Sequence, residues 1–312
     1  MIFTDQAAKL RMIQGYNKME KEPFISNPNS EEMAKQEKIN PTTPLTKVIA
    51  VTSGKGGVGK TTFSVNLAII LSKLGKKVLL MDADLGLANI NVLLGIIPEH
   101  NIYEVFKGKK KIKEVVISTH FGIDFIAGAN GISQLANLNE SQREGFLKDL
   151  ESLNHYDYMI IDTGAGIGQN VLGFLKPADE IIVITAPEPT AIADAYGMIK
   201  SIAINKRDKR IKLIVNEVEN AMQAKKISDR IIHLSNQFLN MEVESLGFIY
   251  KEDLVQRSIM TQRPLVVAYP NAKSSSCILH IAKRILNIKE EEVSGGVSGF
   301  FDKFLQIFQN SQ

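Results

Sequence analysis

The chain carries a glycine-rich loop at Ser53-Gly54-Lys55-Gly56-Gly57-Val58-Gly59-Lys60-Thr61-Thr62, between an apolar segment and an amphipathic one. Glycines let successive backbone N–H groups close around phosphate oxygens without interference from Cβ atoms. The pattern G-x-x-x-x-G-K-[ST] begins at Gly54, which assigns Lys60 to the β- and γ-phosphates and the hydroxyl of Thr61 to Mg²⁺. The loop therefore predicts a nucleotide site.

The flanking sequence is the one that this motif requires. An apolar strand is expected at 47–52, and apolar residues at helical spacing follow over 62–74. The N-terminus of that helix would add its own N–H groups to the phosphate site. Lys55 has no role in the motif and could be an ordinary solvated lysine. Because it lies within a glycine cradle, we interpret it as a second phosphate ligand that reaches a nucleotide held by a neighbouring copy of the chain.

Two later apolar strands lead into acidic residues. Asp82 and Asp84 follow one of them, and Asp162 and Gly164 follow the other. The carboxyl ends of parallel strands face the ligand crevice, so carboxylates there can orient water or hold Mg²⁺ through water. Gly164 can bring its N–H to the γ-phosphate. The alternative in both places is a turn in which Asp bonds its own backbone.

Strands alternate with helical segments along most of the chain. We expect strands at Lys47–Thr52, Lys77–Met81, Tyr158–Ile161, Glu180–Thr185, Ile211–Asn216, Glu244–Ile249 and Leu265–Tyr269. Strands separated by helices predict an α/β fold, a single doubly wound and mostly parallel sheet with helices on both faces. The expected domain covers 47–290, with an N-terminal helical segment at 1–19, a flexible linker at 20–46 and a C-terminal segment at 291–312.

Composition narrows the class of protein. With 44% hydrophobic residues, the chain can bury a sizeable core. The single cysteine, Cys277, indicates a reducing, cytoplasmic compartment and cannot hold an iron–sulfur cluster between subunits. A net charge of +3 does not suggest nucleic-acid binding, and the lysines of 107–113 are interpreted as a solvated loop. No apolar run is long enough for a transmembrane helix.

Together these motifs resemble the MinD/ParA family of deviant P-loop ATPases (the SIMIBI class), over roughly residues 47–287. The resemblance implies ATP or ADP and Mg²⁺ as ligands, slow ATP hydrolysis, and an ATP-dependent homodimer in which Lys55 crosses to the partner's nucleotide. It also implies that Asp84 orients the attacking water, that Asp82 and Asp162 act on Mg²⁺ through water, and that Asn216 holds the adenine edge. Without the resemblance, Asn216 could equally be a turn residue. The implied catalytic set is Lys55, Lys60, Asp84 and Asp162, and the implied nucleotide-binding set is Gly54 to Thr62, Gly164 and Asn216.

Two features are similar to the flagellar FlhG group of that family, also called YlxH or FleN. MinD typically has proline where this chain has Gly164, and the segment Asp5–Arg11 reads D-Q-A-A-K-L-R. In the FlhG group this segment stimulates the signal-recognition-type GTPase FlhF. The resemblance implies that Gln6 positions water in FlhF while Asp5 and Arg11 dock, and it adds flagellar switch (C-ring) proteins as a partner class. The alternative is a frayed terminal helix without a partner.

The C-terminal segment follows a flexible break at Gly295 and Gly296. On a helical projection one arc holds the apolar side chains of Phe300, Phe301, Phe304, Leu305, Ile307 and Phe308. This pattern predicts an amphipathic helix that inserts into a membrane interface. Its polar face is not basic, so one copy would bind lipid weakly and a dimer more tightly. The alternative is a helix docked on its own ATPase domain.

These interpretations combine into one hypothesis. The chain would be an ATP-dependent, membrane-associating switch that controls flagellar number and placement, peripheral on the inner face of the cell membrane as an ATP-bound dimer. Three alternatives remain: a MinD-type division-site regulator, a ParA-type segregation ATPase with a basic DNA-binding face, and a nucleotide-gated adaptor that does not hydrolyse ATP.

Overall fold

The computed structural model describes residues 46–84, 89–128, 149–205 and 210–288. The expected partner-activating residues Asp5, Gln6 and Arg11 lie outside the described residues, as does the expected membrane helix at 300–308. Both remain predictions from the sequence.

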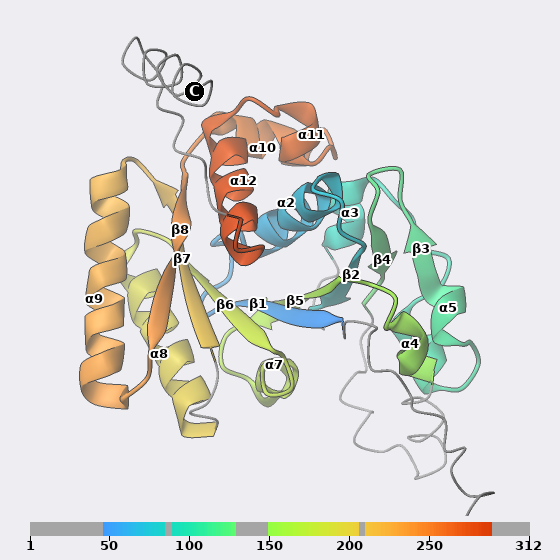
Figure 1. The fold of residues 1–312 in the computed structure, drawn as a ribbon, viewed down its shortest axis with the longest axis horizontal. Helices are drawn as coiled ribbons and strands as arrows, with labels where there is room; N and C mark the ends of the chain where they lie inside the picture. The colour runs from blue at the N-terminus through green and yellow to red at the C-terminus, as the bar shows by residue number, and fades with distance from the viewer. Residues whose placement is uncertain (1–45, 85–88, 129–148, 206–209, 289–312) are drawn as a thin grey trace, which may run out of the picture. The chain divides into compact units, whose positions relative to one another are not determined.

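The described residues form a sheet whose eight strands are ordered β3-β4-β2-β5-β1-β6-β7-β8 (Figure 1). Their bounds are β1 Lys47–Ser53, β2 Val78–Ala83, β3 Val116–Ser118, β4 Asp124–Ile126, β5 Tyr158–Ala165, β6 Glu180–Thr185, β7 Arg210–Val218 and β8 Val243–Tyr250. Only β3, at one edge, runs antiparallel to its neighbour; the other pairs are parallel. The predicted doubly wound α/β fold is confirmed, and β1 lies between β5 and β6, where the winding direction reverses.

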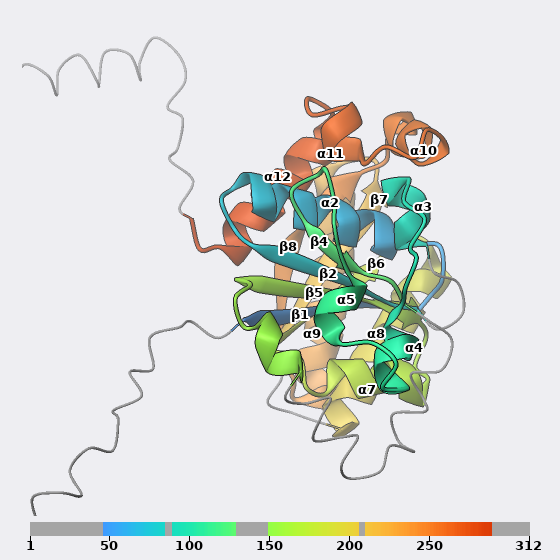
Figure 2. The same ribbon diagram turned by 90° about the vertical axis from the view of Figure 1, so that its right-hand side faces the viewer.

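Helices cover both faces of this sheet (Figure 2). The described helices are α2 Lys60–Lys73, α3 Ile90–Leu94, α4 Ile102–Phe106, α5 Ile112–Val115, α7 Gln169–Leu175, α8 Pro189–Asn205, α9 Ala221–Leu239, α10 Asp253–Met260, α11 Leu265–Ala268 and α12 Lys273–Ile285. On one face, α2 packs against β2 and β5 while α12 packs against α2 and β8. On the other, α7, α8 and α9 cover strands β1, β6, β7 and β8.

Successive side chains along the central strands point to opposite faces of the sheet, so each strand contributes to the hydrophobic core on both faces. In β1, Ile49 and Val51 belong to the cluster beneath α2, whereas Ala50 belongs to the cluster beneath α7 and α8. In β2, Leu80 faces α2 and Leu79 the opposite side. Because both faces are covered, successive residues are buried whichever way they point. This explains why the parallel strands appear in the sequence as continuous apolar runs.

The strand expected at Leu265–Tyr269 is wrong, because this segment forms α11. Its β-branched residues suggested a strand, but Pro264 begins a helical turn in which its carbonyl accepts from the N–H groups of Val267 and Ala268, both at 2.9 Å. The side chain of Asn66 on α2 accepts from the N–H of Val266 at 3.0 Å. Burial against α2 therefore stabilises a short helix where local propensity favoured a strand.

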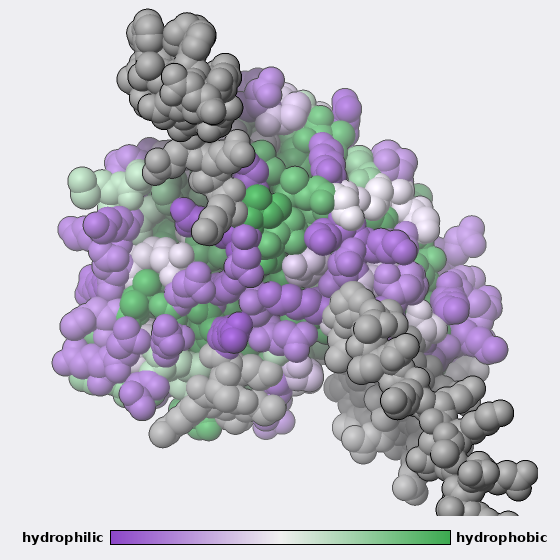
Figure 3. Space-filling model, in the orientation of Figure 1, coloured by the Kyte–Doolittle hydropathy of each residue, from purple (hydrophilic) through white to green (hydrophobic). Residues whose placement is uncertain are grey.

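The lysine-rich stretch 107–113 lies on the surface, as expected, although its C-terminal end enters α5. Lys107 lies over the ring of Tyr103 at 4.3 Å, and Lys110 pairs with Glu114 at 3.3 Å. In Figure 3 hydrophilic residues are spread over much of the coloured surface, and a hydrophobic patch lies in its upper middle. Among the described helices, none combines the length and the hydrophobicity that crossing a bilayer would require.

We expect the core around β4 to be sensitive to loss of volume. Phe125 is fully buried there, so Phe125→Ala should lower the free energy of unfolding by about 3–5 kcal/mol. Phe238 on α9 is 64% exposed, and Phe238→Ala should change that free energy by less than about 0.5 kcal/mol. Urea unfolding followed by circular dichroism measures both. Equal losses for the two variants would contradict the assigned core.

Candidate functional site

The glycine-rich loop connects β1 to α2 in a fixed conformation. Gly57 and Gly59 have φ angles of 81° and 85°, which favour glycine. The hydroxyl of Ser53 donates to the carbonyl of Lys55 at 2.9 Å, and the N–H of Gly166, after β5, donates to the carbonyl of Ser53 at 2.9 Å. The loop is therefore shaped by its own residues and by the strand beside it.

Two glycines of the loop are required by close neighbours. A Cβ atom at Gly54 would lie 2.1 Å from the carbonyl oxygen of Asp194, in α8. A Cβ atom at Gly59 would lie 2.2 Å from Nδ2 of Asn216, which donates to the carbonyl of Val58 at 2.9 Å. Asn216 thus holds the loop, which the sequence did not indicate. Its contact with the adenine edge remains a prediction.

Asp162, in β5, joins this strand to the glycine-rich loop and the start of α2. Its carboxylate, 1% exposed, accepts from the hydroxyl of Thr61 at 2.7 Å, from the hydroxyl of Ser64 at 2.9 Å and from Nζ of Lys60 at 3.3 Å. Burial raises the pKa of Asp162, and the ammonium of Lys60 opposes part of that rise. Ser64 was missed because the loop motif ends before it, although it lies one helical turn beyond Lys60.

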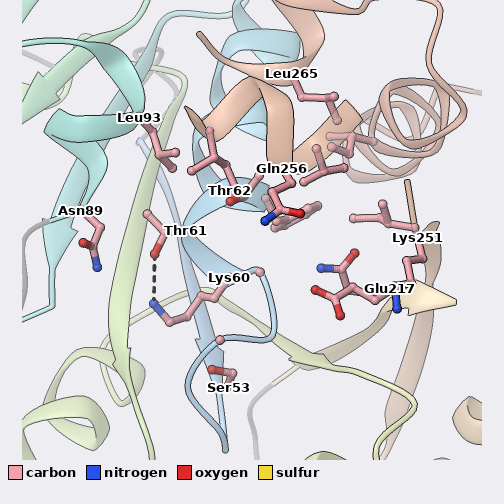
Figure 4. Close-up of a pocket in the computed structure, with 18 of the residues that line it drawn as sticks. Ser53, Lys60, Thr61, Thr62, Asn89, Leu93, Glu217, Lys251, Gln256 and Leu265 are labelled. Carbon is pink, nitrogen blue, oxygen red and sulfur yellow. Dashed lines mark hydrogen bonds between the residues drawn. The ribbon is translucent and has the colours of Figure 1, made fainter. Parts of the chain in front are cut away.

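This arrangement fits Mg²⁺. The hydroxyl of Thr61 and the carboxylate of Asp162 are hard oxygen donors, and Mg²⁺ in nucleotide sites binds few protein groups while keeping water and phosphate oxygens. Lys60 lies beside them, with Nζ 3.5 Å from the hydroxyl of Thr61 (Figure 4). The structure therefore brings together Lys60, Thr61 and Asp162, three residues that the sequence assigned to phosphate and Mg²⁺, and these roles remain predictions.

Asp82 holds the segment that follows β2. Its carboxylate accepts from the N–H groups of Asp84 at 3.0 Å, Asn89 at 3.2 Å and Ile90 at 3.4 Å. Burial is the largest cause that raises the pKa of Asp82 to about 6, with the charge of Asp162 adding to the rise. The carboxylate therefore fixes both ends of a segment whose middle, residues 85–88, lies outside the described residues.

Asp84 and Gly164 lie close together beside the loop. Asp84 lines the cavity, and a Cβ atom at Gly164 would lie 3.4 Å from its Oδ1. At that distance a side chain at 164 would make an ordinary van der Waals contact with the carboxylate of Asp84, so packing alone does not require glycine there. The water-orienting role of Asp84 and the phosphate contact of Gly164 remain predictions.

Lys55 does not point into its own site. Its Nζ pairs with the carboxylate of Glu188 and donates to the hydroxyl of Thr190 at 3.0 Å. The hydrogen bond from Lys55 lowers the pKa of Glu188. Both side chains are exposed to solvent, and ion pairs of this kind contribute little to stability. Lys55 is thus held loosely beside the β6–α8 connection.

Part of the glycine-rich loop, together with Asp84 and Asn216, lines a cavity of about 570 Å³ (Figure 4). Lys60 and Thr61 lie at one end, and Glu217 and Lys251 lie at the other. Glu217 has a φ of 57°, a conformation that residues other than glycine seldom adopt. The segment from Tyr250 to Gln256 was not recognised in the sequence because it carries no motif. The only feature of the sequence that could have indicated its place at the cavity was its position after the carboxyl end of a predicted parallel strand.

The sequence was also compared with known protein families and with individual proteins. Residues 46–215 match a family model described as an AAA domain. The antiactivator FleN of Pseudomonas aeruginosa is 33% identical over 77% of this chain and 86% of its own length. The flagellum site-determining protein YlxH of Helicobacter pylori is 35% identical over 84% of this chain and 90% of its own.

Solved structures share the fold. The MinC:MinD cell division complex of Aquifex aeolicus contains a chain that is similar with a TM-score of 0.65 and 27% identity, over 77% of this chain and 96% of that one. MinD of Pyrococcus horikoshii, solved with Mg-ADP, is similar with a TM-score of 0.63 and 24% identity, over 80% and 98%. The second likeness supports the fold alone.

We expect Gly54 to be essential for the site. In Gly54→Ala the added methyl group must displace the start of α8 or the loop, so affinity for Mg-ADP should fall more than about tenfold. Gly197→Ala, in α8 with open space around its Cβ position, is the matched control and should keep wild-type affinity. Titration calorimetry measures both, and thermal melting checks folding. A folded Gly54→Ala protein with unchanged affinity would show that the contact with Asp194 does not constrain the loop.

Proposed function

Because the chain belongs to the MinD/ParA family of P-loop ATPases, we propose that it is an ATP-driven switch that dimerises, associates with membrane and controls flagellar number and placement. The observation that carries the dimerisation in this proposal is the different placement of the two loop lysines, Lys55 and Lys60. Lys60 lines the cavity and contacts the buried Asp162, whereas Lys55 does not line the cavity and pairs with Glu188. A lysine held outside its own site is available to a second copy.

The residues of one subunit supply most of the hydrolytic site. Loop N–H groups and Lys60 would hold the phosphates of ATP and neutralise the charge that develops during transfer. Asp84, at the edge of the cavity, would orient the attacking water. Thr61 would bind Mg²⁺ directly and Asp162 through water, and the ion would supply further neutralisation of the phosphates. Asp82 would keep Asp84 in place through its backbone N–H.

Dimerisation would complete that site. Lys55 would leave Glu188 and Thr190 and reach the nucleotide of the partner, where a phosphate offers it more negative charge than one carboxylate does. Because the pair with Glu188 is exposed, giving it up costs little. Each subunit would then depend on the other for hydrolysis. This dependence suits a molecular switch, in which ATP hydrolysis serves to change where the protein is located and which partners it binds.

The flagellar assignment rests on two supports. FleN and YlxH, both similar over most of this chain, are described as an antiactivator and as a flagellum site-determining protein. In addition, the segment Asp5–Arg11 resembles the FlhF-stimulating element. MinD-type relatives share the ATPase, but this segment favours a flagellar role with FlhF as partner. The apolar residues at 300–308 would bring the ATP-bound dimer to lipid.

We expect Lys55 to be required for the dimer. Asp84→Ala should bind ATP without hydrolysing it and accumulate as a dimer, whereas Asp84→Ala combined with Lys55→Ala should remain a monomer. Lys225, an exposed lysine on α9, gives the matched control: Asp84→Ala with Lys225→Ala should still dimerise. Size-exclusion chromatography with light scattering at saturating Mg-ATP measures the mass. A monomeric Asp84→Ala protein would contradict the proposed cycle.

The flagellar role predicts an effect on a partner GTPase. The wild-type protein should raise the GTPase rate of FlhF, and Gln6→Ala should abolish most of that stimulation, because the Gln6 amide would position water in the partner. Lys9→Ala, in the same segment, is the control and should keep stimulation. Phosphate release by FlhF provides the readout. Absence of stimulation by the wild type would refute the flagellar assignment and leave the ATPase intact.

A further inference from the structure

Residues of the segment from Tyr250 to Gln256 line the cavity, and Lys251 of this segment lies at the end away from Lys60. It leaves the end of β8, where the N–H of Lys251 donates to the carbonyl of Val218 in β7 at 3.0 Å. That bond fixes the segment on its sheet side. With the phosphates at Lys60, the part of this segment around Lys251 would face the base of a bound nucleotide.

Glu252 fixes the same segment on its other side. Its Oε2 accepts from the N–H and from the hydroxyl of Ser274, at 2.7 and 2.5 Å, and its Oε1 accepts from the N–H of Lys273 at 3.3 Å. The carbonyl oxygen of Tyr250 lies 3.1 Å from the same hydroxyl, so the single hydroxyl hydrogen of Ser274 is shared between Glu252 and Tyr250. The first turn of α12 therefore contacts this segment at two residues, Tyr250 and Glu252.

The electrostatics of this contact favour an ionised carboxylate. A helix N-terminus carries unpaired N–H groups and a partial positive charge, so it stabilises an acidic group. Burial acts to raise the pKa of Glu252, but the hydrogen bonds from Ser274 and the N–H of Lys273 outweigh it and lower the pKa overall. Glu252 thus serves as a capping group supplied by a distant part of the chain.

The helix that Glu252 caps is firmly placed. Ile278, Ile281 and Ala282 of α12 are buried in the core cluster that contains α2. Near its other end, Nη1 of Arg284 donates to the carbonyl of Leu246 in β8 at 3.0 Å. Because α2 begins at the phosphate loop, α12 is fixed relative to the phosphate end of the cavity.

From these contacts we infer that Glu252 is a positioning residue for nucleotide binding. By holding the first turn of α12, its carboxylate sets where Lys251 to Gln256 lies against the base, and so determines how much the base contributes to affinity. The residues assigned to the phosphates, Lys60 and Thr61, contact each other and Asp162, whereas Glu252 contacts Lys273 and Ser274. This inference rests on the proposed nucleotide-binding function and adds a residue that no motif marks.

Comparing a whole nucleotide with its phosphates tests the inference. Affinities for Mg-ADP and for Mg-pyrophosphate are measured by titration calorimetry on the full chain. Glu252→Ala should weaken ADP binding about tenfold, the size of a lost cap, and leave pyrophosphate binding within about twofold. Glu252→Gln retains one acceptor oxygen and should lie between wild type and Glu252→Ala. Glu244→Ala, an exposed glutamate on β8, is the matched control and should change neither affinity.

The outcomes separate the possibilities. Unchanged ADP affinity in Glu252→Ala, or an equal loss for ADP and pyrophosphate, would overturn the inference, because neither result is specific to the base. If Glu252→Ala does not fold, the same comparison is made with Glu252→Gln and Ser274→Ala, which remove fewer contacts. Failure of the wild type to bind ADP would instead refute the proposed function.

Discussion

The buried carboxylate of Asp162 is the constraint on which the rest of the site depends. A charge at this depth is tolerated only when hydrogen bonds and an opposite charge compensate for lost water, and Lys60, Thr61 and Ser64 supply them. All three belong to the first turns of α2, whereas Asp162 ends the apolar part of β5. Pairing of β1 with β5, in which Val51 lies opposite Asp162, is what places them together. The order of strands in the sheet therefore creates the phosphate end of the cavity.

A second constraint acts on the glycine-rich loop, because residues distant in the chain lie very close to two of its glycines. The carbonyl of Asp194, in α8, lies too close to Gly54 to leave space for a Cβ atom. The side chain of Asn216, near the end of β7, does the same at Gly59. These two glycines serve the packing of the loop against its own domain as well as access for phosphate. The same glycine-rich motif thus meets two requirements, and a side chain at either position would disturb both.

The C-terminal third of the described chain completes the cavity from the side opposite the loop. Asn66 ties α2 to α11 through the N–H of Val266, and Glu252 ties the segment after β8 to α12. Each contact joins two segments that are separate in the sequence, so neither contact can be inferred from local sequence patterns. Side chains of α10, α11 and α12 line the cavity, although none of these helices carries a recognisable phosphate motif.

The sequence by itself determined the loop, the acidic strand ends, six of the seven expected strands and the doubly wound class, because each depends on local spacing. It failed at Leu265–Tyr269, where tertiary burial against α2 overrode strand propensity. Only the tertiary structure decided that Lys55 lies on Glu188, that Asn216 and Ser64 support the loop, and that Glu252 reaches α12. Most of these partners are far apart in the chain, from 22 positions for Glu252 and Ser274 to 158 for Asn216 and Val58. The periodicity of apolar residues indicates which way a residue faces within its own helix or strand. A contact between residues far apart in the chain forms only when the fold brings separate helices and strands together.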